Sequence, residues 1–222
     1  MQGNLGPWPY EVEYGIENGV ECDVLVLGGG VAGCFAAISA ANQGARVVVV
    51  DKGPIKTGVS GGAGCDHWNY PLTTPFSKIT PEELVDFVDF VTDGWFCGIG
   101  LYIQCRESWD CLLDAERWGL PPRDVDGEPK GSGFRDEETG ILFAYNHDNR
   151  HIVRVRGGAR IKEYYHRELR RLGVPLYERV MATSLLTEGG KEGARVVGAT
   201  GLNVRTGEFY IFKAKSTGSA CP

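Results

Sequence analysis

A glycine cluster at residues 28–33 limits the folds open to this chain more than any other feature. It reads G-G-G-V-A-G, matches the pattern G-x-G-x-x-G, and follows the apolar run at 24–27. A short, apolar and partly β-branched run is typical of a strand buried on both faces of a parallel sheet. Helix formers at 34–43 and a second apolar run at 47–50 come next. The sequence therefore predicts a strand–helix–strand unit in which the glycines form the first turn.

The glycines and the acidic residue after the second strand have separate roles in dinucleotide binding. Gly28 permits the tight turn, Gly30 leaves room for a pyrophosphate, and Gly33 lets the helix pack closely on the strand. The N-terminus of the helix offers N–H groups and a partial positive charge to phosphates. Asp51 would accept hydrogen bonds from ribose hydroxyls and repel a 2′-phosphate, which disfavours NADP. The pattern predicts a dinucleotide site; the alternative is a plain strand–helix–strand unit whose glycines serve only the turn.

A second glycine-rich segment, at 57–64, favours FAD over NAD. In an NAD domain a crossover helix usually follows the second strand soon, but here the next predicted helix begins only at Pro81. A loop of about thirty residues is uncommon in a compact domain unless it is functional. Its glycines allow the backbone to pass close to a flat or charged group. A flavin fits that need, and an NAD-dependent dehydrogenase domain is the alternative.

Composition excludes several other classes of protein. The 222 residues are 42% hydrophobic and 23% charged, as in globular domains. A net charge of −6 argues against a nucleic-acid partner. The apolar runs are too short for a membrane span, and no signal peptide is recognised, so a cytoplasmic location is expected. Seven scattered cysteines without a C-x-x-C pair disfavour a zinc site, an iron–sulfur cluster and a disulfide framework, so no metal site is predicted.

Taken together, these motifs resemble a known family. The stretches D-V-L-V-L-G-G-G-V-A-G, V-V-V-V-D-K-G and T-G-V-S-G-G-A-G are similar to the flavoprotein subunits of fumarate reductase, succinate dehydrogenase, L-aspartate oxidase and adenylylsulfate reductase. The segments at 177–180, 198–201 and 209–215 resemble the adenylylsulfate reductase alpha subunit most closely. The resemblance implies an α/β fold: a Rossmann-like FAD-binding domain with a parallel sheet, added helices and an antiparallel three-stranded meander. It also implies an FAD-dependent oxidoreductase with a small-molecule substrate and, in several members, a separate iron–sulfur subunit.

The resemblance further implies which residues contact FAD. In the first glycine turn, pyrophosphate contacts are implied for Gly28, Gly30, Val31, Ala32 and Gly33. At the end of the second strand, ribose contacts are implied for Asp51 and Lys52. In the second glycine segment, contacts with pyrophosphate and isoalloxazine are implied for Thr57, Gly58, Ser60, Gly61, Gly62 and Ala63, and further on the backbone of Val180 is implied to contact adenine. Gly58 occupies the place of the histidine that bonds covalently to the flavin in the membrane-complex members, so the FAD is predicted to be non-covalent.

Periodicity and turn residues place the remaining elements. A capping box, Thr80 to Glu83 with proline at the first helical position, predicts a helix of about a dozen residues. Further helices are expected at 101–118 and 159–172, a strand at 174–180, and meander strands at 181–186, 195–204 and 208–215. The whole chain is interpreted as the N-terminal portion of an FAD-binding domain, with its core in 22–120 and 157–222 and a loop-rich excursion at 121–156.

The last residues differ from the family pattern. In the family a buried strand follows the meander and ends in Ala-Thr-Gly-Gly. Here Thr217-Gly218 looks like a remnant of that signature, and only Ser216 separates it from Lys215. This strand is therefore predicted to be missing, together with the C-terminal part in which the family places its catalytic residues. The catalytic residues are accordingly unknown, and a non-catalytic nucleotide-binding fragment is a third hypothesis.

Several other residues have both a functional and a structural interpretation. His67 is a catalytic acid or a substrate contact or, as we favour, a packed histidine beside Trp68. Asn69 matches an asparagine that faces substrate in adenylylsulfate reductase. A basic patch would bind an anionic substrate or, as we favour, form a solvated loop and edge strand; it comprises His147, Arg150, His151, Arg154 and Arg156. Cys105 and Cys111 are expected to pack in the core. Trp95, Trp109 and Trp118 are expected to lie in the core or at an interface.

Overall fold

The computed structural model describes residues 15–58, 61, 64–123, 133–144, 148–155 and 158–220. The chain divides into two compact units. Unit 1 comprises Met1–Gly62 and Tyr165–Pro222, and unit 2 comprises Ala63–Tyr164.

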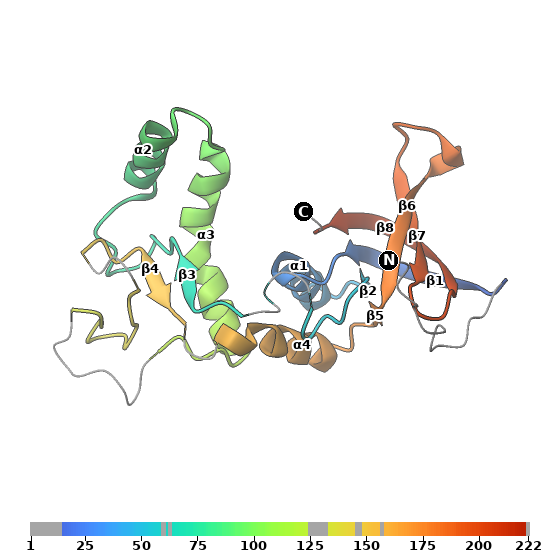
Figure 1. Ribbon diagram of the computed structural model, residues 1–222, viewed down its shortest axis with the longest axis horizontal. Helices are drawn as coiled ribbons and strands as arrows, with labels where there is room; N and C mark the ends of the chain where they lie inside the picture. The colour runs from blue at the N-terminus through green and yellow to red at the C-terminus, as the bar shows by residue number, and fades with distance from the viewer. Residues whose placement is uncertain are drawn as a thin grey trace, which may run out of the picture. The chain divides into compact units, whose positions relative to one another are not determined.

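Unit 1 is built on a six-stranded sheet in the order β5-β2-β1-β8-β7-β6 (Figure 1). Strand β1 pairs in parallel with β2 and with β8, and β2 pairs in parallel with β5. Strands β8, β7 and β6 form an antiparallel meander. The strands are β1 (Glu17–Leu27), β2 (Val47–Asp51), β5 (Leu176–Glu178), β6 (Val180–Thr187), β7 (Val196–Asn203) and β8 (Phe209–Ser219). The predicted α/β class, with a parallel sheet and a three-stranded meander, is confirmed.

The helix α1 (Val31–Asn42) connects β1 to β2 and completes the predicted strand–helix–strand unit. Its Cys34, Ala37 and Ile38 are fully buried, and every residue of β2 is buried, as a central parallel strand requires. The helix ends before Gly44, whose φ of +82° is suited to glycine. A second helix, α4 (Ile161–Arg171), leads back to the sheet through β5.

The sequence predicted that the separate buried strand after the meander is missing, and no strand follows β8 among the described residues. The expectation that the sheet would therefore lack one of its strands was wrong, because β8 itself lies beside β1. Strand β8 pairs with β7 and also runs parallel to β1, from Glu17↔Phe209 to Leu27↔Ser219. The last strand of the meander is eleven residues long and continues beyond the end of β7, so its final residues fill the position beside β1. Sequence reasoning looked for a separate apolar strand, but residues 216–219 pair through their backbones while their side chains stay at least partly exposed.

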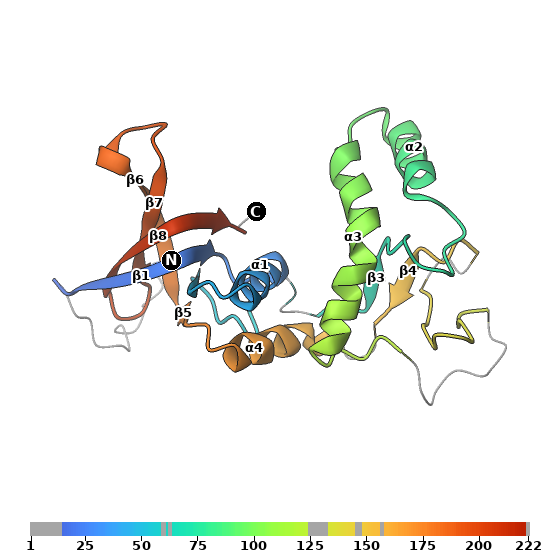
Figure 2. The ribbon, with the colours of Figure 1, turned by 180° about the vertical axis from the view of Figure 1, so that it is seen from behind.

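Unit 2 contains an antiparallel helix pair and a small sheet. Figures 1 and 2 both show α2 (Pro81–Thr92) and α3 (Gly98–Arg117) side by side, joined by a short turn. The predicted capping box is confirmed, because the Thr80 hydroxyl accepts from the Glu83 N–H at 3.1 Å and the Glu83 carboxylate accepts from the Thr80 N–H at 2.7 Å. Strand β3 (His67–Asn69) pairs antiparallel with β4 (Ile152–Arg154).

The described part of the 121–156 excursion contributes to the core of unit 2. Ile141, Leu142, Phe143, Val153 and Val155 are each at most 4% exposed. The Phe143 ring lies 5.2 Å from that of Phe76, centroid to centroid. Residues 124–132, 145–147 and 156 of the excursion lie outside the described residues. Within the described part of the chain, none of the helices has the length and apolar character that crossing a bilayer requires.

Candidate dinucleotide-binding site

The turn between β1 and α1 has a backbone that calls for glycine. Gly28 has a φ of +103° and donates its N–H to the Val50 carbonyl at 2.8 Å, which ties the turn to β2. Gly30 is the N-cap of α1 with extended backbone angles. The first turn of α1, which the structure describes throughout, carries no acidic side chain. Its N–H groups have no carbonyl partners within the helix, and its partial positive charge is suited to an anion.

Two of these glycines also have no room for a side chain. A Cβ on Gly33 would lie 1.8 Å from the carbonyl oxygen of Gly28, so the helix approaches the strand as the sequence predicted. A Cβ on Gly29 would lie 2.6 Å from Cγ1 of Ile55, a side chain that is fully buried. The turn therefore presents backbone, rather than side chains, toward a ligand.

Asp51 links the glycine turn to the end of β2. Its carboxyl group is buried, since the residue is 6% exposed, and it accepts hydrogen bonds from the N–H of Gly29 and from that of Gly53, each at 2.6 Å. Each carboxylate oxygen has a second lone pair, so the group retains the capacity to accept from ribose hydroxyls. The arrangement places a hydrogen-bond acceptor for a sugar beside the turn that is suited to a diphosphate.

The loop after Asp51 is held by β5. The N–H of Ile55 donates to the Glu178 carboxylate at 2.6 Å. The N–H of Gly58 donates to the Pro54 carbonyl at 2.7 Å, and a Cβ on Gly58 would lie 2.8 Å from that same oxygen. The close turn thus favours glycine at position 58.

The other implied contact residues are placed as follows. Lys52 and Thr57 are exposed, and Gly61 has a φ of +84°. Val180 begins β6, is 2% exposed, and pairs with Asn203 across the meander. Ser60, Gly62 and Ala63 lie outside the described residues. Contacts of all these residues with FAD remain predictions.

A parallel strand, a glycine turn, an open helix N-terminus and a buried carboxylate at the end of the next strand together define a dinucleotide-binding domain. The family model that matches the chain narrows this class, because it describes an FAD binding domain and covers residues 23–217. The chain belongs to this family of FAD-binding domains. FAD fits this site, because Gly29 and Gly33 leave no room for side chains at the turn and the Asp51 carboxylate lies against the turn through its bond from the Gly29 N–H.

Three proteins similar to this chain are each much longer than it. One subunit of the CoM/CoB fumarate reductase from Methanothermobacter marburgensis is 30% identical over 205 residues, which are 89% of this chain and 34% of that protein. A 3-oxosteroid 1-dehydrogenase from Mycolicibacterium smegmatis is 43% identical over 68 residues, 29% of this chain and 12% of that protein. The structure of adenylylsulfate reductase from Archaeoglobus fulgidus superposes with a TM-score of 0.77 at 25% identity, covering 97% of this chain and 33% of that one. The resemblance stated from the motifs is confirmed, and the chain spans about a third of the length of the first and third of these relatives.

In unit 2, the histidine beside the second glycine segment has local partners. His67 Nδ1 lies 2.5 Å from the Asp66 carboxylate, and this hydrogen bond lowers the pKa of Asp66. The Trp68 indole N–H donates to the Ser108 hydroxyl at 2.8 Å, and that hydroxyl donates to the Asn69 carbonyl at 2.8 Å. These contacts of Trp68 and Ser108 fix β3 against α3, and both interpretations of His67 stay predictions.

Two described members of the basic patch have separate partners. Arg150 pairs with Asp136 at 3.5 Å and lies 5.0 Å from the centroid of the Phe143 ring. His151 stacks on Tyr70 with 6.0 Å between ring centroids, and burial lowers its pKa. Arg154 is exposed on β4, while His147 and Arg156 lie outside the described residues. These separate partners favour local structural roles over a shared anion site.

The cysteines and tryptophans divide between core and surface. Cys105 is fully buried, and burial raises the pKa of its thiol to about 11, which suits core packing. Trp109 packs edge-on against Phe76 at 5.6 Å. Trp95, by contrast, is 91% exposed, so it is not a core residue. Among the described side chains there is no group of three metal-ligating residues that could hold an ion.

Sequence reasoning missed two features of the site. The first is that Asp51, besides the ribose role predicted for it, anchors the glycine turn. The D-K-G sequence could have indicated the bond from the Gly53 N–H, because an aspartate side chain often accepts from the N–H two residues on, but not the bond from the Gly29 N–H. The second is Glu178, whose contact with the loop joins residues 123 positions apart. No local pattern in the sequence carries that information.

Proposed function

We propose that this chain is the FAD-binding part of an oxidoreductase similar to fumarate reductases and adenylylsulfate reductases. The observation that carries the proposal is the hydrogen bond from the Gly29 N–H to the buried Asp51 carboxylate. This bond sets the ribose acceptor against the diphosphate turn. The family match and the similarity to a fumarate reductase subunit and to an adenylylsulfate reductase support the oxidoreductase class.

In this proposal the protein binds and orients the cofactor. The first turn of α1 would hold the diphosphate through its N–H groups, with Gly28, Gly30, Val31, Ala32 and Gly33 providing the close backbone. Asp51 and Lys52 would bind the adenosine side. The segment from Thr57 to Ala63 would run beside the diphosphate and the flavin ring, and the Val180 backbone would face adenine. When bound, FAD supplies two-electron chemistry to a small-molecule substrate.

The proposal has three further parts. The FAD is non-covalent, because the position of the linking histidine is held by Gly58, where a Cβ would meet the Pro54 carbonyl. The electron partner is a separate iron–sulfur chain, an idea supported by the name of the Methanothermobacter relative, which makes it one subunit among others. The location is cytoplasmic, and the scattered cysteines support this because they do not form the pattern of a disulfide framework.

Cofactor binding is tested by titrating the purified chain with FAD and with NAD. We expect flavin fluorescence to be quenched on binding, with an affinity for FAD well above that for NAD, and acid precipitation to release all the yellow chromophore. Asp51→Asn should weaken FAD binding while Glu21→Gln, an exposed control on the same sheet, should not. Preferential binding of NAD would return the chain to the dehydrogenase alternative, and chromophore retained in the precipitate would refute the non-covalent part.

Activity is a separate question for this chain. The FAD-loaded protein is assayed for reduction of fumarate, adenylylsulfate and an artificial dye. Turnover of any of these supports the oxidoreductase proposal at the level of this chain. FAD binding without any turnover would leave a non-catalytic binding unit, as the third hypothesis states.

A further inference from the structure

The helices α2 and α3 and the turn between them expose six large apolar side chains. Trp95, Phe90 and Ile99 are 91%, 82% and 77% exposed, and Phe87, Val91 and Ile103 are each at least 55% exposed. We call the surface that carries them the α2–α3 face. Large exposed apolar side chains of this kind are typical of interaction sites.

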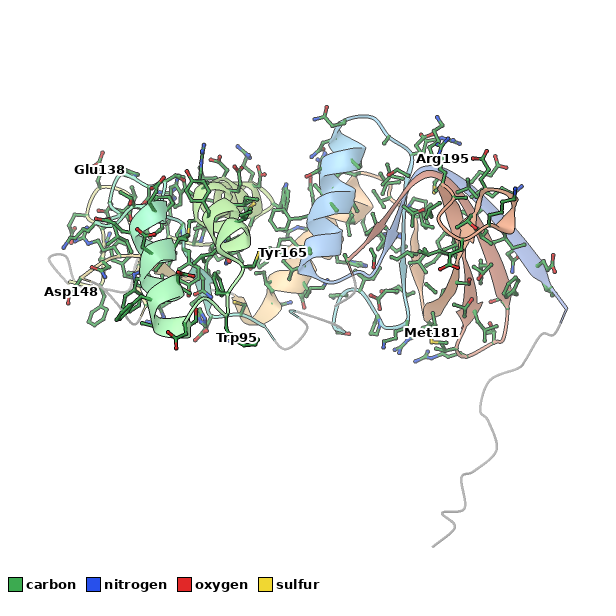
Figure 3. All side chains as sticks on the ribbon, turned by 90° about the horizontal axis from the view of Figure 1, so that it is seen from above. Trp95, Glu138, Asp148, Tyr165, Met181 and Arg195 are labelled. Atoms are coloured by element: carbon green, nitrogen blue, oxygen red, sulfur yellow. The ribbon has the colours of Figure 1, made fainter. Side chains whose placement is uncertain are left out.

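The turn that carries Trp95 is held in one conformation. The N–H of Gly94 donates to the Asp89 carbonyl at 3.1 Å, and the N–H of Trp95 donates to the Thr92 carbonyl at 3.0 Å. Asp93, with a φ of +52°, ends α2 in the left-handed conformation. Figure 3 labels Trp95 beside the helix pair. A tryptophan displayed on a fixed turn loses little conformational freedom on binding, and tryptophan is the residue type most enriched at interface hot spots.

The charge on this face is mainly negative, although the Arg106 guanidinium lies over the Tyr102 ring, 5.9 Å from its centroid, and helps to lower the pKa of Glu82. From residue 79 to residue 105 the sequence contains no Lys, Arg or His, but it contains Glu82, Glu83, Asp86, Asp89 and Asp93. Between α2 and α3 lies a groove of about 300 Å³. Glu82 and Asp86 line its α2 side, and Ile99 lines its α3 side. A hydrogen bond from its own backbone and one from the Tyr102 hydroxyl lower the pKa of Glu82.

We propose that this α2–α3 face is a docking site for a basic amphipathic helix of another polypeptide. The apolar side of that helix packs on Ile99 and Trp95, and its lysines or arginines lie against Glu82 and Asp86. A helix laid in an apolar groove with flanking opposite charge is a common mode of recognition. A second copy of this chain fits less well, because a symmetric contact sets the acidic row of one copy against that of the other. An anionic membrane surface repels the same row.

The test uses a defined probe and the whole FAD-loaded chain. The probe is a helical peptide of leucine and lysine, about five turns or 18 residues long, with leucine on one face; a leucine–glutamate peptide of the same pattern is its counterpart. Binding is measured by calorimetry at low and high salt. We expect a 1:1 complex with the lysine peptide that weakens as salt rises, and no binding of the glutamate peptide.

Matched variants locate the binding. Asp86→Lys and Ile99→Ser should each weaken the lysine peptide by about tenfold or more. The controls Glu192→Lys and Leu185→Ser change one exposed acid and one exposed apolar residue of unit 1, and should keep the affinity within about twofold. Because all four positions are exposed or nearly so, circular dichroism should report an unchanged fold.

Several results would overturn the proposal. These are absence of peptide binding, equal binding of the glutamate peptide, or equal losses in the unit 1 controls. A dimer seen by sedimentation that dissociates in Ile99→Ser would assign the face to a second copy instead. Binding to anionic lipid vesicles that depends on Ile99 would assign it to a membrane.

Discussion

Replacing Asp51 tests whether the glycine turn depends on the carboxylate behind it. In the native chain this buried group accepts two N–H groups, from Gly29 and Gly53, at 2.6 Å each. Asp51→Ala leaves both donors without their acceptor, and an unsatisfied buried donor costs about 1–3 kcal/mol. We therefore expect the free energy of unfolding to fall by about 2–6 kcal/mol, a large part of the 5–15 kcal/mol typical of a domain. Asp51→Asn keeps one acceptor oxygen and should lose about half as much.

The assay combines urea unfolding, followed by circular dichroism, with amide hydrogen exchange. Exchange at Gly29 and Gly53 should accelerate in Asp51→Ala, because these two amides lose their partner directly. Glu21→Ala is the control; its side chain is 72% exposed and lies 3.8 Å from Lys213, so its loss should cost less than about 1 kcal/mol. If Asp51→Ala unfolds with the free energy of the native chain and the two amides stay protected, the carboxylate does not hold the turn and the reasoning is refuted.

Three further substitutions test neighbouring parts of the argument. Gly33→Ala should destabilise the chain by more than about 1 kcal/mol in urea unfolding, since its Cβ would lie 1.8 Å from a carbonyl oxygen, whereas Gly19→Ala, with nothing within 4 Å, should stay near native. Glu178→Ala should weaken FAD binding by releasing the Ile55 N–H, and Glu178→Gln, which keeps an acceptor, should restore most of the affinity; equal losses would contradict this. Burial lowers the pKa of His151, so below about pH 6.5 the unfolded chain takes up a proton that the folded chain resists. Stability should therefore be full above that pH and decline as the pH falls toward the folded pKa, and His151→Phe should flatten the decline in thermal unfolding.

The parts of the fold predicted well are those with local signals. The capping box at Thr80 and Glu83, the glycine at the end of α1 and the two apolar runs of the parallel sheet each depend on residues within a few positions. Their physics is that of one helix end or one strand, and the sequence displays it directly. The three strands of the meander were found for the same reason, because turn residues separate them.

The parts that were missed depend on partners far apart in the chain. Strand β8 fills the position beside β1 through backbone pairing, and a backbone pairs irrespective of the polar side chains at 216–219. The contact between Glu178 and Ile55 likewise requires β5 to lie beside β2. Trp95 was expected in a core or an interface, and only the turn geometry decides that it points outward.

The site depends both on local sequence signals and on contacts between residues far apart in the chain. Its ligand class was therefore easier to infer than the contacts that hold it in place. The glycine pattern and Asp51 identify the ligand class, because each residue has a role that its side chain, or the lack of one, dictates. What holds these residues in place is a chain of contacts from β5 through Glu178 to the loop, and from Asp51 to the turn. Both acceptors project from neighbouring positions of paired strands, since Asp51 stands opposite Glu178 in the β2–β5 register. The parallel sheet therefore sets the spacing of the two carboxylates, and through them the positions of the loop and the glycine turn. A change that shifts β5 against β2 should accordingly disturb cofactor binding even where every residue expected to touch the cofactor is unchanged.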